Sequence, residues 1–190
     1  MSPFRNLLGP LALLFAGCAG GAFPWSGSSD PAALRDAVVR RYPVTGNTAA
    51  EVRAQLDATG PVDDHGTRRD GLTHWEIRWQ LPAGDGTCRA DTVQVDAQVV
   101  VTLPDWRAPD GVDPVLRRQW EWYLHALAAH EQGHVDVVRQ ALPDVRNALV
   151  AAACTDLNGA GRREVERVRS LQDAYDERTG HGRRDGATFP

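Results

Sequence analysis

The 190-residue chain contains no lysine, so arginine supplies all 21 of its basic side chains. Its formal net charge of −4 also means that it lacks the basic balance that usually marks a nucleic-acid-binding protein. The apolar run Leu7–Phe15 is too short to span a bilayer, which takes about 20 apolar residues. We find no internal repeat. The length and ordinary composition therefore favour one globular domain preceded by a leader and a linker.

The N-terminus has the order of a secretory signal peptide, with a charged start, an apolar middle and small residues before Cys18. The run Leu-Phe-Ala-Gly-Cys that ends at Cys18 also resembles a bacterial lipobox, which predicts cleavage before this cysteine and lipid attachment to it. Ordinary signal cleavage nearby is the alternative. We therefore expect a signal peptide at 1–17, a lipid-anchored flexible linker at 18–35 and a domain at 36–190. The expected location is the cell envelope, with membrane contact only through the anchor.

Cysteine is scarce, with three residues in the chain. If Cys18 carries lipid, Cys88 and Cys154 remain as an even pair in an oxidising compartment, which predicts a disulfide. Two unpaired buried thiols are the alternative. Neither cysteine has a Cys or His at the close spacing of a zinc site.

Strand patterns occupy the first half of the domain. Alternating apolar residues predict a half-buried strand at 73–79. A glycine-rich turn at 84–86 and a valine-rich stretch at 88–103 complete an antiparallel hairpin, and 41–46 is a short N-terminal strand. Asn47 or Thr48 can cap a helix at 49–56.

Helical patterns occupy the second half. Residues 114–150 are predicted helical, with a break or kink at Pro143. A turn at 158–161 and a second helix at 162–177 follow. Strands followed by helices predict an α+β fold, in which a small antiparallel sheet packs on a C-terminal helical half.

The pentapeptide His130-Glu131-Gln132-Gly133-His134 has the form H-E-x-x-H and lies within the predicted helix. Residues four apart share a helix face, so both imidazoles can reach one metal ion. Glu131 can then act as general base on a zinc-bound water. Two histidines satisfied by hydrogen bonds, or a structural metal site, are the alternatives. Gly133 costs about 1 kcal/mol in a helix relative to alanine, which hints at close packing there.

A catalytic zinc needs a third protein ligand. The long metzincin form is excluded because its glycine and histidine do not follow His134. At 1.5 Å per residue, a helix from His134 to residue 153 is about 29 Å long and one from 161 to 178 is about 26 Å long. If the two helices pack antiparallel, the chain just after 178 returns to the level of His134. This favours His181, with Asp176 orienting a ligand imidazole. The other candidates are Asp176 itself, Asp144, Glu164 and Glu166.

Several further segments resemble a family of uncharacterised bacterial proteins described as predicted secreted zinc-dependent proteases. They are 42–48 with Glu51 and Leu56, Gly60-Pro61, 73–75 with Trp79, Cys88-Arg89, 101–104 with Trp106, Trp120, Tyr123, the HEQGH pentapeptide and 175–182. The resemblance covers about 40–185 and implies that 175–182 belongs to the folded site.

These observations predict an exported zinc peptidase that acts on a peptide or protein of the cell envelope. A non-catalytic envelope protein with a structural zinc, or a binding module without metal, is the alternative. Tyr123 and Tyr175 are considered as donors to the oxyanion of peptide attack, although ordinary packing is favoured for both.

Overall fold

The computed structural model describes residues 34–81 and 88–190. The predicted signal peptide, Cys18 and nearly all of the predicted linker lie outside these residues. The elements follow in the order β1 (Val38–Val44), α1 (Ala49–Thr59), β2 (Leu72–Gln80), η1 (Ala90–Thr92), β3 (Gln94–Trp106), α2 (Pro114–Ala151), η2 (Cys154–Asp156), α3 (Leu157–Thr179) and η3 (Arg183–Asp185). Strands precede the two long helices, which confirms the predicted α+β class.

The three strands form one sheet in the order β1-β3-β2. β2 and β3 make the predicted antiparallel hairpin, with Thr73 opposite Val101. β1 joins β3 in parallel, so the sheet is mixed rather than wholly antiparallel. The parallel pairing follows from the chain path, because β2 runs opposite to β1 and β3 runs opposite to β2.

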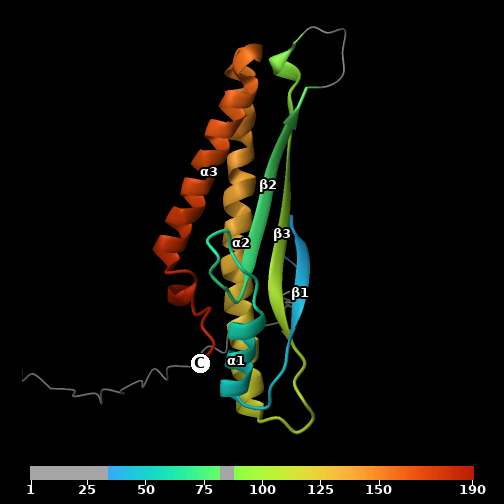
Figure 1. Ribbon diagram of the computed structural model, residues 1–190, viewed down its shortest axis with the longest axis vertical. Coiled ribbons are helices and arrows are strands. Elements are labelled where there is room, and N and C mark those ends of the chain that lie inside the picture. Colours follow the sequence, from blue (N-terminus) through green and yellow to red (C-terminus); the bar gives the residue numbers. More distant parts are fainter. Residues whose placement is uncertain (1–33, 82–87) are drawn as a thin grey trace, which may run out of the picture.

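One face of the sheet packs along α2, and α3 packs along α2 on another side (Figure 1). The strand that contributes most to this contact is β3, in which alternate residues turn toward the helix. Its buried side chains there are Ala97, Val99, Val101 and Leu103. α2 therefore lies at the centre of the molecule, and residues on it are shielded from both sides.

α2 runs through Pro143 without the break that was one of the two predicted outcomes. A proline in a helix leaves the carbonyl four residues earlier without its donor. Pro143 is exposed, so water can reach this part of the helix surface. In the part of the chain that the structure describes, no helix combines the length and apolar character required to cross a membrane.

β3 differs from the predicted strand at both ends. Residues 88–93 lie outside the strand, with Ala90–Thr92 among them forming a short 3₁₀ helix, and the strand continues past Pro104 to Trp106. Beyond Thr102 the β2 partner has ended, so β3 is paired only with β1. A proline is tolerated where one side of a strand is unpaired.

The predicted turn at 158–161 is helical, because α3 begins at Leu157. Gly161 is buried, and a Cβ on it would overlap the indole ring of Trp79. The indole Nε1 of Trp79 also donates a hydrogen bond to Asn158 Oδ1 at 2.9 Å. The glycine thus allows helix and strand to approach closely, a role that sequence alone does not distinguish from a turn.

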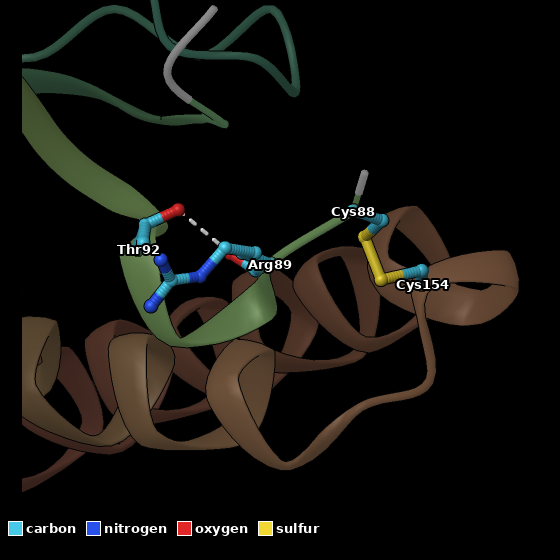
Figure 2. Close-up of a disulfide and its surroundings, with 4 residues drawn as sticks. All are labelled: Cys88, Arg89, Thr92 and Cys154. Atoms are coloured by element: carbon cyan, nitrogen blue, oxygen red, sulfur yellow. Dashed lines mark hydrogen bonds between the residues drawn. A yellow bond between two sulfur atoms is a disulfide. The ribbon is translucent and has the colours of Figure 1, made fainter. Parts of the chain in front are cut away.

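The real turn between the two long helices contains η2, and Cys154 within it is joined to Cys88 (Figure 2). The two Cα atoms lie 6.1 Å apart, a usual separation for a disulfide. Beside the bond, the hydroxyl of Thr92 donates to the carbonyl of Arg89 at 2.7 Å. The bond connects the chain before β3 to the turn between α2 and α3.

Candidate metal centre

The HEQGH pentapeptide lies within α2, as its pattern predicts. The helix begins at Pro114, and Asp113 caps it by accepting a hydrogen bond from the Val115 amide at 2.8 Å. The rings of His130 and His134 lie on one side of the helix, with centroids 4.8 Å apart. Their side chains are only 5% and 12% exposed. Two imidazoles are therefore held close together in a largely buried position.

Asp176 of α3 lies against both rings. Its Oδ1 is 3.3 Å from Nε2 of His130 and 3.1 Å from Nε2 of His134. Within the described residues, these three side chains are the group whose potential ligand atoms all lie within 4.8 Å of one another. Burial alone would raise the pKa of Asp176, but hydrogen bonds with His130 and His134 outweigh it and hold this pKa well below its ordinary range.

The start of α3 explains why Asp176 reaches this position. α2 ends at Ala151, 17 positions after His134. The same count from the start of α3 at Leu157 reaches Ala174, which lies midway between Gln172 and Asp176. The sequence-based estimate began the returning helix at 161. Four residues are about one helical turn, so that estimate moved the residue expected beside His134 from Asp176 toward His181.

His181, the predicted third ligand, lies next to the group rather than in it. Its Nδ1 is 3.2 Å from Oδ2 of Asp176, and its side chain is 48% exposed. His181 has a left-handed backbone with φ +54°, between Gly180 and Gly182, which are also left-handed. The glycines thus allow the predicted turn. Asp176 rather than His181 therefore lies against both motif histidines, and His181 contacts Asp176.

Gln172 fixes the orientation of His134, and no motif or spacing in the sequence points to this role. Its amide Nε2 donates to the carbonyl of His134 at 3.0 Å, so its Oε1 faces His134 Nδ1, 2.5 Å away. Nδ1 must therefore carry a proton, and the lone pair of a neutral His134 lies on Nε2, beside Asp176. This is the arrangement in which an imidazole binds a metal through Nε2.

Glu131 is buried beside this group, with 4% of its surface exposed. The hydroxyl of Thr73, on β2, donates to Oε2 of Glu131 at 2.7 Å. A Cβ on Gly71 would lie 2.7 Å from Oε1, so only glycine leaves room for the carboxylate there. Burial raises the pKa of Glu131, and the Thr73 hydrogen bond and the two histidines counter this only in part. A raised pKa suits a carboxylate that takes up a proton.

Asp70 anchors the chain segment that contacts Glu131. Its carboxylate pairs with both Nη atoms of Arg53 on α1 and accepts from the Tyr123 hydroxyl on α2 at 2.8 Å. Its backbone carbonyl accepts from the Tyr42 hydroxyl on β1 at 2.7 Å. Three separate elements thus hold the residue just before Gly71. The hydroxyl of Tyr123 is used in this network.

Tyr175 packs on the two motif histidines. Its ring stacks on His130 with centroids 5.2 Å apart and meets His134 edge-on at 4.7 Å. Its hydroxyl donates to the backbone carbonyl of His130 at 3.1 Å. In this arrangement Tyr175, like Tyr123, donates to a protein oxygen, which favours the packing roles expected for both.

The other candidate ligands lie in surface ion pairs. Arg167 pairs with Asp144 at 3.2 Å and with Glu164 at 2.7 Å, and Arg169 pairs with Glu166 at 3.4 Å. None of these three carboxylates belongs to the histidine group found in the described residues. Glu164 and Glu166 lie in the first half of α3, and Asp144 follows the motif by more than two turns of α2. Helix geometry therefore separates all three from the site.

The group fits a metal ion. Two imidazole nitrogens and one carboxylate oxygen are a usual donor set for zinc with an open position. Without a metal, both Nε2 atoms can approach the same Asp176 oxygen favourably only as donors, which requires His134 to carry protons on both nitrogens. Burial would lower the pKa of His134, but Asp176, Glu131 and Gln172 raise it. A cation at this point would replace those protons.

Comparison with known proteins gives a family but no function. The model of a bacterial protein family of unknown function, DUF922, matches residues 39–182. No curated protein and no solved structure matches the chain. The matched segment includes every residue of the histidine–aspartate group as well as Glu131 and His181. Because it spans well over half of the 190 residues, the chain belongs to DUF922, a family of bacterial proteins of unknown function.

Proposed function

We propose that this protein is an exported zinc-dependent peptidase, in which His130, His134 and Asp176 hold the metal and Glu131 is the general base. The observation that carries the proposal is the convergence of three potential ligand atoms from α2 and α3. A buried carboxylate lies beside that convergence, in the position that the H-E-x-x-H pattern gives to a base. The spacing of the two histidines alone would support metal binding, but not peptide hydrolysis with a general base.

Zinc, when bound, supplies a Lewis acid that polarises a carbonyl and brings the pKa of water to about 7. The chain supplies the remaining parts. Glu131 accepts the proton of the attacking water on its carboxylate, and Thr73 holds Oε2 of that carboxylate in place. Gln172 keeps the lone pair of His134 directed at the site. Asp176 adds a negative charge that favours a divalent cation.

The proposed substrate is a peptide or protein of the cell envelope. This part of the proposal depends on the signal-like N-terminus and on lipid attachment at Cys18, both of which lie outside the described residues. The Cys88–Cys154 bond is consistent with an oxidising compartment.

The deciding experiment uses the zinc-loaded domain and a mixed library of unstructured peptides, with products identified by mass spectrometry. Wild-type protein should cleave peptide bonds, and Glu131→Gln should keep its zinc and its helical content while losing activity by about 100- to 10,000-fold. Asp144→Asn, which alters an exposed carboxylate on the same helix, is the matched control and should cleave normally. Equal cleavage by wild type and Glu131→Gln would show that Glu131 is not the base.

One observation favours a second candidate, a closed structural zinc site. Nδ1 of His181 lies 3.2 Å from Oδ2 of Asp176, which makes this imidazole the candidate for a fourth protein ligand. Four protein ligands would leave no open position, and the protein would then be non-catalytic. Cobalt substitution separates the two candidates, because only an open site should change its visible spectrum when a small ligand such as azide is added.

A further inference from the structure

The Nδ1 atom of His130 is buried and has no hydrogen-bond partner. This is unusual, because buried polar side-chain atoms almost always have one. Its counterpart on His134 is satisfied by Gln172 at 2.5 Å. The two motif histidines are thus supported unequally, although both direct Nε2 at Asp176.

The carboxylate oxygen Oδ2 of Asp185 lies 4.0 Å from this nitrogen. That distance is too long for a direct hydrogen bond. The Asp185 side chain is 47% exposed, so it is free to change its torsion angles and approach His130.

The C-terminal segment 182–189 holds Asp185 beside His130. Gly182 packs on the imidazole, since a Cβ there would lie 3.1 Å from Cγ of His130. Ala187 and Phe189 are buried, and the Phe189 ring meets the Tyr123 ring edge-on with centroids 5.2 Å apart. η3 and its Asp185 therefore lie between two anchored points, and only the side chain needs to move.

We infer that Asp185 is a positioning residue that accepts a hydrogen bond from Nδ1–H of His130 when a metal occupies the site. This rests on the proposed function only in requiring that the site binds a metal. A metal on Nε2 leaves the proton of a neutral imidazole on Nδ1, and a buried N–H without an acceptor is costly. A carboxylate acceptor supplies that partner, fixes the ring and strengthens the nitrogen as a ligand. Asp185 thus does for His130 what Gln172 does for His134.

The test measures zinc affinity by competition with a chromophoric chelator, using the full domain with its disulfide intact. Asp185→Ala should bind zinc about 10- to 100-fold more weakly than wild type. Asp185→Asn, which keeps a neutral acceptor of the same shape, should fall between the two. Asp144→Ala is the matched control, because it removes an exposed carboxylate from α2 and should leave affinity unchanged.

A second readout distinguishes positioning from general stability. In the zinc-bound protein, nitrogen-15 NMR should show a protected Nδ1–H on both His130 and His134. Asp185→Ala should abolish protection at His130 and preserve it at His134, whereas loosening of the fold would affect both. Zinc affinity equal to wild type in Asp185→Ala, or equal loss of protection at the two histidines, would overturn the inference and leave the metal site standing. Failure of wild-type protein to bind zinc would instead remove the proposed function, and this inference with it.

Discussion

The hydroxyl of Tyr175 occupies the space that Gly133 leaves open on α2. A Cβ at position 133 would overlap this hydroxyl and the ring carbon that bears it. The same hydroxyl donates to the carbonyl of His130 at 3.1 Å, and the ring stacks on the His130 imidazole. The glycine inside H-E-x-x-H therefore allows α3 to pack directly on the two motif histidines.

Gly133→Ala should destabilise the domain despite adding a better helix former. The gain in helix propensity is about 1 kcal/mol, whereas forcing a methyl group into a packed contact costs about 1–3 kcal/mol. Urea unfolding should therefore show a net loss. The matched background is Tyr175→Ala, where the ring is gone and Gly133→Ala should be neutral or stabilising. A stabilised Gly133→Ala in the wild-type background would contradict the packing described for Tyr175.

Removal of Asp176 should weaken zinc binding more than removal of His181. We expect Asp176→Ala to exceed the roughly 10- to 100-fold loss typical of a residue that only orients a ligand. His181→Ala should stay within that range, because His181 contacts the other Asp176 oxygen. Zinc content and zinc affinity of the two variants show which loss is larger. His130→Ala and His134→Ala, which should lose the metal, serve as references. The reverse order would return the third-ligand role to His181.

Gln172→Leu should reduce zinc affinity by about 10- to 100-fold while keeping the size of the side chain. Leucine cannot accept the Nδ1–H of His134, so the imidazole loses the partner that fixes its ring. Gln172→Glu keeps an acceptor at this position and should retain more affinity than Gln172→Leu. The same chelator competition measures both variants, and equal affinities in the two would show that the acceptor is unimportant.

Loss of the Cys88–Cys154 bond should cost stability without removing the metal site. The bond spans a sequence separation of 66, for which the chain-entropy model gives roughly 4 kcal/mol at most. Cys88→Ser/Cys154→Ser should unfold at lower urea yet bind zinc as wild type does, because the bond lies at the opposite end of α3 from Asp176. Non-reducing mass spectrometry of protein isolated from its host should find the linked peptides. Free thiols at both positions would refute the bond in the protein as its host makes it.

Local patterns were enough to predict most of the secondary structure. The alternation of Trp75, Ile77 and Trp79 predicted β2, and Thr48 caps α1 by accepting from the Glu51 amide at 3.2 Å. The HEQGH pentapeptide lies in the helix where its neighbours predicted one. These features depend on residues close together in the chain, which is why their spacing is informative.

The sequence by itself determined that His130 and His134 share one side of a helix with Glu131 next to them, because helical periodicity fixes that arrangement. Only the tertiary structure decided which residues from other elements contact these three side chains. α3 begins one turn earlier than the glycines of 158–161 suggested, since Gly161 serves the contact with Trp79, and this brings Asp176 to the histidines. Gly71 and Thr73 meet Glu131 from a different strand. Such contacts depend on where elements distant in sequence begin and pack, and no local pattern encodes that.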